Sequence, residues 1–181
     1  MRDDELKWEV LETESLLHTP VFEVLAQRER SAAGQEGRYV AMQAPDWVMV
    51  VPVLGDQFVL VRQWRHAARR LTTEFPGGVC DPKEDPAETA ARELLEETGF
   101  RAGRLRKLGE CSPNPALFAN RFYIYLAEEL IPTGRQHLDA DELLSYELRP
   151  IRQVVADFGS PDFSHAMMGA ALTFYLRCQG I

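Results

Sequence analysis

The sequence is poor in cysteine and contains no cysteine motif. Cys80, Cys111 and Cys178 are odd in number and widely spaced, and none belongs to a CxxC pair. This pattern argues against a disulfide framework and against a zinc knuckle. It is typical of a protein from a reducing compartment, and the cytoplasm is therefore the expected location.

The sequence also lacks a long apolar run and an excess of basic residues. The first residues, MRDDELKWEV, contain no apolar signal core, and no run approaches the length of a membrane span. Twenty Lys and Arg stand against 28 Asp and Glu, which gives a net charge of −8. This charge disfavours non-specific binding to nucleic acid or to an anionic membrane. An anionic substrate would therefore need local help from well-placed arginines or from a metal cation.

What remains is an ordinary globular composition with strong strand signals in its first third. Residues 21–30 and 38–43 flank the turn-prone SAAGQEG and predict a hairpin. Residues 47–54 and 57–64 flank Gly55-Asp56 and predict a second hairpin, which is more continuously apolar and hence more buried. The break near residues 44–46 predicts an N-terminal β unit, 1–45, followed by a main domain, 46–181.

The stretch from Asp85 to Gly99 predicts a well-delimited helix. Asp85 is an N-cap acceptor, Pro86 suits the first helical position, and Gly99 suits the C-terminal stop. At 100° per residue, one side is expected to face a core, and this side carries Ala87, Ala91, Leu94 and Leu95. The other side carries Glu93, Glu96 and Glu97, whose like charges destabilise a helix by roughly 0.2–0.5 kcal/mol per pair. Such repulsion calls for a functional reason.

Later segments complete the fold prediction. Strands are expected at 104–111, 121–130 and 143–149, with the loop SPNPALFAN between the first two, and helices are expected after Pro150. The order of strands, helix, strands and helices predicts the α+β class with a mixed sheet.

The loop before the helix and the helix itself resemble the full Nudix box, G-x5-E-x7-R-E-U-x-E-E-x-G-U, where U is apolar. Gly78, Glu84 and the run RELLEETGF from Arg92 fill every fixed position. From average residue frequencies, a chance match in a chain of this length is on the order of 1 in 10⁷. The resemblance implies the Nudix fold, a mixed sheet sandwiched between helices. It also implies hydrolysis of a nucleoside diphosphate linked to another group.

The same resemblance assigns roles to the box residues. Glu93 and Glu97 match the core metal ligands, Glu96 assists them, and Gly77 matches the residue whose carbonyl binds the metal. Arg92 is expected to orient the glutamates by ion pairing, and Glu84 to brace the loop or a metal-bound water. Oxygen-rich sites of this kind suit Mg²⁺ or Mn²⁺, either of which is the expected cofactor. The competing interpretation, a solvated acidic helix face, does not explain the complete spacing.

Three further stretches resemble the ADP-ribose and nucleoside-diphosphate-sugar pyrophosphatase subgroup. Pro115 lies sixteen positions after Gly99, where that subgroup carries a proline. VRQWR and EFPGG are similar to the subgroup's QYR and E-x-P-x-G pattern, in which the last arginine, here Arg65, meets a substrate phosphate. Glu74 either contacts substrate or ends a strand.

The acidic stretch HLDADE occupies the place of a loop that supplies another metal ligand or the base that activates water. Glu142 matches the metal-binding glutamate best. The family's proposed base falls near Ala140, which has no proton-accepting side chain, so that Asp139, Asp141, Glu142 or a helix glutamate stays a candidate.

The resemblance therefore predicts a metal-dependent hydrolase that splits ADP-ribose into AMP and ribose 5-phosphate, or splits a related sugar nucleotide. The N-terminal β unit is expected to form a homodimer, as such units often do in this subgroup. Two alternatives stay open: hydrolysis of damaged nucleoside triphosphates, and non-catalytic sensing of ADP-ribose.

Overall fold

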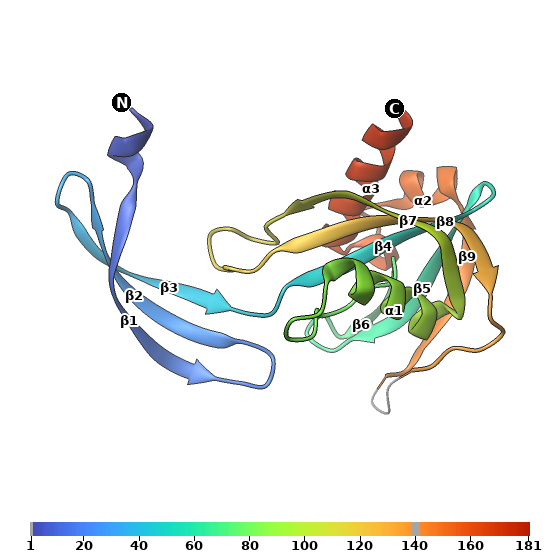
Figure 1. Ribbon diagram of the computed structural model, residues 1–181, viewed down its shortest axis with the longest axis horizontal. Coiled ribbons are helices and arrows are strands. Elements are labelled where there is room, and N and C mark those ends of the chain that lie inside the picture. The colour runs from blue at the N-terminus through green and yellow to red at the C-terminus, as the bar shows by residue number, and fades with distance from the viewer. Residues whose placement is uncertain (1, 139–141) are drawn as a thin grey trace. The chain divides into compact units, whose positions relative to one another are not determined.

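The computed structural model describes residues 2–138 and 142–181, which form two compact units (Figure 1). The first unit contains Met1–Pro45 and Ser112–Arg121, and the second contains Asp46–Cys111 and Phe122–Ile181. The loop 112–121 was not expected to join the N-terminal strands. No helix among the described residues is long and apolar enough to cross a membrane.

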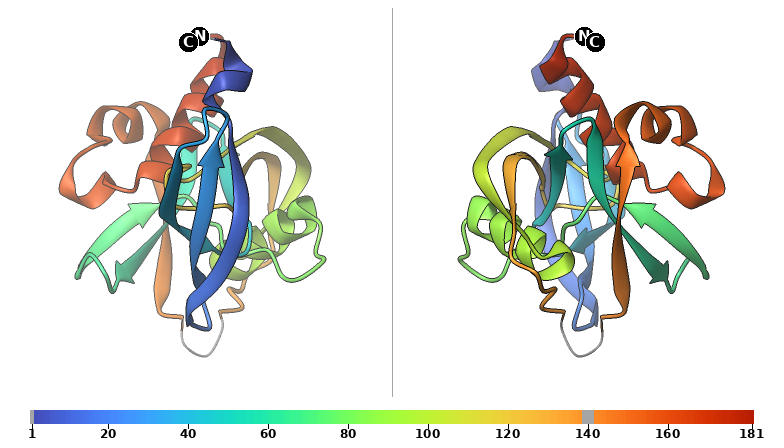
Figure 2. Two further views of the ribbon diagram at one scale, coloured as in Figure 1. Left: turned by 90° about the vertical axis from the view of Figure 1, so that its left-hand side faces the viewer. Right: turned by 90° about the vertical axis from the view of Figure 1, so that its right-hand side faces the viewer.

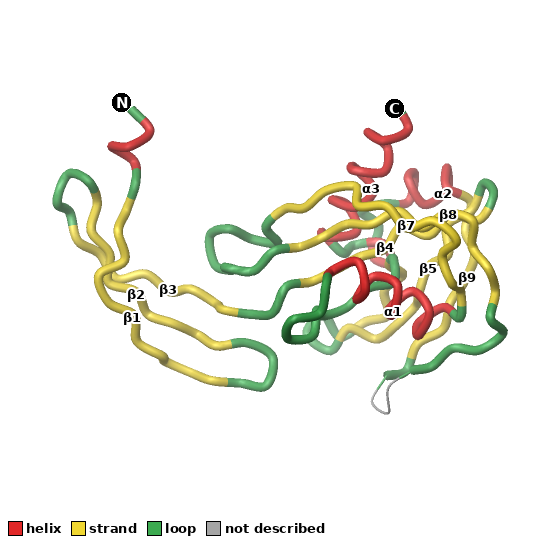
Figure 3. Tube along the Cα trace, in the orientation of Figure 1, coloured by secondary structure: helices red, strands yellow, loops and turns green. Residues whose placement is uncertain are grey.

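The first unit is a three-stranded antiparallel sheet in the order β1-β2-β3 (Figure 3). A short 3-10 helix, η1 (Asp3–Leu6), precedes β1 (Trp8–His18), β2 (Glu23–Ser31) and β3 (Glu36–Gln43). The predicted hairpin is thus confirmed as β2 and β3. Strand β1 was not predicted. Almost all of its side chains are exposed, so its sequence does not show the alternation of apolar and polar residues that marks a half-buried strand.

The second unit is built on a six-stranded mixed sheet. Its strands follow the order β6-β5-β4-β8-β7, with β9 paired to β5. The β4–β8 pair is parallel and the other pairs are antiparallel. The strand bounds are β4 (Trp47–Leu54), β5 (Gln57–Arg65), β6 (Arg70–Glu74), β7 (Phe100–Cys111), β8 (Phe122–Pro132) and β9 (Leu144–Pro150). The helices are α1 (Pro86–Thr98), α2 (Ile151–Asp157), the 3-10 helix η2 (Pro161–Phe163) and α3 (Ala166–Gln179).

Alternate residues of the central strands fill two separate cores. Val48 and Val50 of β4 pack with Leu94 of α1, whereas Met49 and Val51 pack with the C-terminal helices. Figure 2 shows α1 on one side of the strands and α2 and α3 on the other. The continuous apolar runs predicted as buried strands are therefore buried on both faces. This is the α+β sandwich that the sequence predicted.

Helix α1 begins and ends as predicted, but it is turned differently. The Asp85 side chain accepts a hydrogen bond from the Ala87 N–H at 2.8 Å, and Gly99 adopts a left-handed conformation with φ 69°. Ala90 and Leu94 are fully buried, whereas Ala91 is exposed, so the prediction that Ala91 faces the core is wrong. The reason lies on the acidic side, where Glu93 and Glu97 are also buried.

Candidate active site

The loop between β6 and α1 lies along the edge of β4. The Val48 N–H donates to the Gly78 carbonyl at 2.9 Å, and the Val50 N–H donates to the Pro76 carbonyl at 2.8 Å. A Cβ atom at Gly77 would lie 2.3 Å from the Val48 carbonyl oxygen, which is backbone and cannot give way. Glycine at 77 is therefore required for the loop to approach the sheet.

This close approach brings the loop against the acidic side of α1. The Gly77 N–H donates to Glu97 Oε2 at 2.8 Å. A Cβ at Gly78 would lie 2.3 Å from Glu93 Oε1. Glycine at 77 thus lets the loop approach β4, and glycine at 78 leaves room for the Glu93 carboxylate.

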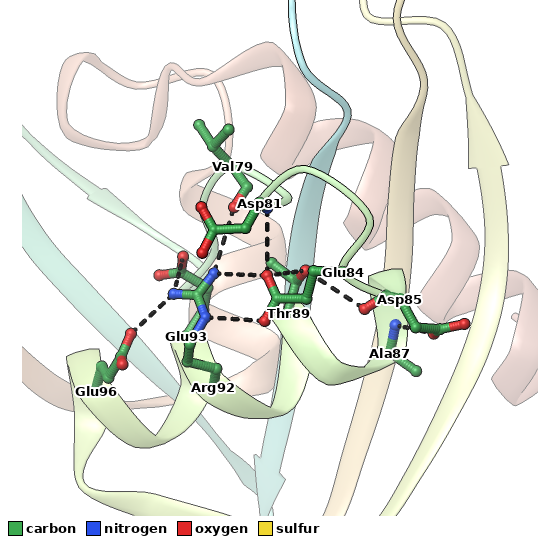
Figure 4. Close-up of polar contacts among 9 residues, drawn as sticks. All are labelled: Val79, Asp81, Glu84, Asp85, Ala87, Thr89, Arg92, Glu93 and Glu96. Carbon is green, nitrogen blue, oxygen red and sulfur yellow. Dashed lines mark hydrogen bonds and ion pairs between the residues drawn. The ribbon is translucent and has the colours of Figure 1, made fainter.

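Arg92 holds three glutamates together (Figure 4). Its Nε and one terminal nitrogen donate to the two oxygens of Glu84, each at 3.1 Å. Its other terminal nitrogen donates to Glu93 and Glu96, each at 2.9 Å. Glu84 also accepts from the Thr89 hydroxyl at 2.8 Å, which fixes the loop to the first turns of α1. The ion pairs expected of Arg92 are therefore present.

Burial raises the pKa values of two carboxyl groups in the site, because it disfavours their charged forms. Burial raises the pKa of Glu93 to about 7, with repulsion from Glu96 and Glu142 adding to it while Arg92 opposes it. Burial raises the pKa of Glu97 to about 8, and repulsion from Glu93 and Glu142 adds to it. Such shifts mark a place where the charged forms lack full compensation.

These groups fit a hard divalent cation. Carboxylate oxygens, here those of the buried pair Glu93 and Glu97, are the ligands that Mg²⁺ and Mn²⁺ prefer. Within 2–138 and 142–181, no three acidic, His or Cys side chains form a ready-made metal cage. The Glu93 and Glu96 oxygens are instead turned toward Arg92, and a Glu97 oxygen toward Gly77.

Arg65 lies at the end of β5, within electrostatic reach of Glu97. Its Nε and one terminal nitrogen donate to the two oxygens of Glu74, at 2.9 and 2.6 Å. Glu74 is the last residue of β6 and is completely buried. Although burial raises it, the hydrogen bonds from Arg65 and the close contact with His165 lower the pKa of Glu74 overall. Glu74 thus ends a strand and holds Arg65, whose side chain stays 42% exposed.

The acidic loop is attached to the C-terminal end of α1. The His137 N–H donates to the Glu96 carbonyl at 2.9 Å, and the Thr133 N–H and hydroxyl both donate to the Gly99 carbonyl. These bonds satisfy carbonyls that a helix end leaves free. Glu142 is exposed, and its charge acts on both Glu93 and Glu97. The candidate bases Asp139 and Asp141 lie outside the described residues, as does Ala140.

Pro115 belongs to the first unit rather than to the unit that carries the glutamates. Its loop pairs with the end of β3, where the Met42 N–H donates to the Leu117 carbonyl at 2.6 Å. Pro115 itself is exposed. Its role in substrate binding stays a prediction.

Comparisons with known proteins agree with the geometry. The NUDIX domain family profile matches residues 44–167. The ADP compounds hydrolase NudE of Escherichia coli is 32% identical over 136 residues, which cover 74% of this chain and 73% of that protein. The ADP-ribose pyrophosphatase of Bacillus subtilis is 28% identical over 141 residues, covering 77% and 76%. A crystal structure of an ADP compounds hydrolase superposes with a TM-score of 0.84 at 29% identity, covering 96% of each chain.

We expect Glu84→Gln to lower the free energy of unfolding at neutral pH by on the order of 1 kcal/mol, because a charged hydrogen bond is lost. Arg92 lowers the pKa of Glu84 from 4.5 to about 2. The stabilisation by Glu84 is therefore present above the unfolded pKa and is lost as the pH falls toward about 2. In urea unfolding with EDTA present, the difference in the free energy of unfolding between wild type and variant should become smaller below pH 4.5.

The matched control is Glu88→Gln, which changes an exposed glutamate in the first turn of α1. Its effect should be much smaller. If the difference in the free energy of unfolding between wild type and Glu84→Gln stays constant down to the acid transition, the Arg92 ion pair is not the cause of that difference.

Proposed function

Since this chain belongs to the Nudix hydrolase family, we propose that it hydrolyses the diphosphate linkage of ADP-ribose, or of a related nucleoside diphosphate sugar, with the help of Mg²⁺ or Mn²⁺. The products from ADP-ribose would be AMP and ribose 5-phosphate. One observation carries the proposal: the buried pair Glu93 and Glu97 lies beside Gly77, with the guanidinium of Arg65 close by. The relatives named for ADP-ribose and ADP compounds supply the substrate class.

The residues that would hold the cation are Glu93, Glu97 and the Gly77 carbonyl, with Glu96 assisting and Glu142 as an additional ligand. When bound, the cation would neutralise charge on the diphosphate and orient a water molecule. Arg65 would donate to a substrate phosphate through the N–H groups that Glu74 does not use. Arg92 would keep the glutamates in place. The base that takes the proton from water would be Asp139, Asp141, Glu142 or a helix glutamate.

The direct test is a substrate panel with Mg²⁺ or Mn²⁺, in which products are separated by chromatography. We expect AMP from ADP-ribose, with faster turnover than for GDP-mannose or for 8-oxo-dGTP. Faster turnover of the triphosphate would favour a nucleotide-pool enzyme instead. If ADP-ribose binds in calorimetry but no product forms with either metal, the chain is an ADP-ribose sensor.

We expect Glu97→Gln to reduce turnover by several orders of magnitude, because it removes a ligand of the cation. The amide keeps the shape of the side chain and an oxygen that can accept from the Gly77 N–H. It also removes a carboxyl group whose ionisation is opposed by burial and by repulsion from Glu93 and Glu142. In EDTA the variant should therefore unfold at a urea concentration at or above that of wild type.

The control for this variant is again Glu88→Gln, which should retain the wild-type rate. Near-normal turnover by purified Glu97→Gln would remove Glu97 from the proposed ligand set. Loss of turnover together with loss of the circular dichroism of the folded protein would point to a structural role instead.

We also propose that the first unit joins two chains into a homodimer. Its sheet exposes several large apolar side chains, and among its described residues Ala26, Ser31 and Asn120 alone are buried. A three-stranded sheet without a covered face is marginal in water, and a second copy could cover it. The exposed apolar residues include Trp8, Val10, Leu16, Leu17, Tyr39 and Val40.

Sedimentation equilibrium should therefore give twice the mass of one chain at micromolar concentration. Val40→Lys, which places a charge on β3, should shift this equilibrium toward the monomer. Gln35→Lys adds the same charge in the exposed β2–β3 turn and should leave the dimer intact. A monomeric wild-type chain would contradict the proposal.

A further inference from the structure

A histidine far along the chain contacts the carboxylate that holds Arg65. His165 Nδ1 lies 2.7 Å from Glu74 Oε2, the oxygen that also accepts from the Arg65 terminal nitrogen at 2.6 Å. The Nδ1–H is not aligned with this oxygen as in a hydrogen bond, so the contact is electrostatic and becomes an ion pair when the ring is protonated.

The other oxygen of Glu74 is equally occupied. Glu74 Oε1 accepts from Arg65 Nε at 2.9 Å and from the Thr72 hydroxyl at 2.5 Å. Each carboxylate oxygen thus contacts one nitrogen of Arg65 and one further group, the Thr72 hydroxyl at Oε1 and His165 Nδ1 at Oε2. These contacts restrict the carboxylate, and the carboxylate in turn orients the guanidinium.

His165 occupies the N-cap position of α3, yet its side chain makes no capping hydrogen bond. A residue at this position usually accepts a hydrogen bond from a backbone N–H of the first helical turn through a side-chain oxygen. Here the side chain reaches the end of β6 instead. The His165 side chain therefore contacts Glu74 and takes no part in capping α3.

The segment before α3 is anchored so that His165 stays in place. Phe163 of η2 is buried in the core beneath the C-terminal helices. Asp162 lies 3.4 Å from the Arg62 guanidinium, which also donates to the Thr73 hydroxyl at 2.9 Å. The ring of His165 therefore projects from a rigid support, not from a free loop.

We propose that His165 is a positioning residue for substrate binding, which acts through Glu74 to hold the Arg65 guanidinium in the orientation that receives a phosphate. The inference rests on the proposed function of Arg65. Two of the five N–H groups of Arg65 are bonded to Glu74, and among the described residues Glu74 is the only hydrogen-bond partner of this side chain. The remaining N–H groups can receive a phosphate only if the guanidinium does not turn about the Glu74 carboxylate.

The test compares His165→Leu, His165→Asn and His165→Gln. Leucine removes the polar nitrogen that contacts Glu74. Asparagine places its amide nitrogen near the position of Nδ1, and glutamine places it farther out, near that of Nε2. We expect the KM for ADP-ribose to rise about tenfold in the Leu and Gln variants, with kcat within about twofold of wild type, and to return close to the wild-type value in the Asn variant.

A second measurement does not depend on turnover. The affinity for the non-hydrolysable α,β-methylene analogue of ADP-ribose, measured by calorimetry with Mg²⁺ present, should fall by the same factor in the Leu and Gln variants. Ser164→Ala is the matched control: it removes a hydrogen bond to the Pro161 carbonyl within the same segment without touching Glu74. Its KM and its analogue affinity should equal those of wild type.

The outcomes separate the two proposals. If wild type neither hydrolyses ADP-ribose nor binds the analogue, the proposed function fails. If wild type does both and the Leu and Gln variants keep wild-type KM and affinity, the role of His165 alone is refuted. A fall in kcat without a change in KM, or an Asn variant no better than folded Gln, would also overturn it. If the Leu variant does not fold, the comparison of KM and analogue affinity between the Asn and Gln variants still tests the role of His165.

Discussion

The site depends on carboxylates that are buried next to one another before any cation arrives. Arg92 supplies one positive charge to Glu84, Glu93 and Glu96, and Glu97 receives a backbone N–H from Gly77. Negative charge therefore exceeds positive charge in a place where water is largely excluded. The repulsion between neighbouring glutamates on a helix is small, but the cost of their burial is larger, and a bound divalent cation would relieve both. Binding of such a cation would explain why an acidic cluster is kept where it weakens the helix.

The rest of the fold supports that arrangement. The alternation of β4 sends Val50 toward α1 and Val51 toward the C-terminal helices, so that the sheet is fixed from both faces. A rigid β4 can then hold the loop by two backbone hydrogen bonds. Glycine at 77 allows the loop to come close, and glycine at 78 leaves room for Glu93. Gly77, the box glycine Gly78 and the box glutamates thus pack together as one unit, which explains the fixed spacing within the box.

The sequence predicted what local chemistry determines and missed what long-range packing determines. The ends of α1 follow from Asp85 and Gly99, which act within one turn, and both were found. The orientation of α1 was wrong at Ala91, because periodicity does not reveal that a loop covers Glu93 and Glu97. Nothing near His165 in the sequence indicates a role, since its partner Glu74 lies ninety-one positions earlier by their residue numbers. Strand β1 has no buried face and so gave no periodic signal.

Because the whole chain is acidic, the few positively charged groups at the site are important for binding an anionic substrate. A protein with a net charge of −8 repels a diphosphate at long range, so attraction must come from nearby groups. A divalent cation on α1 and the guanidinium at the end of β5 would supply it from two sides. The cation is positioned by its ligands, whereas a free arginine side chain would sample many rotamers and lose entropy on binding. Glu74, completely buried and held by Thr72 and His165, removes that freedom in advance. On the proposed function, the Arg65–Glu74 ion pair would therefore serve binding by ordering Arg65 before substrate binds, and its benefit would lie in substrate affinity rather than in the stability of the fold.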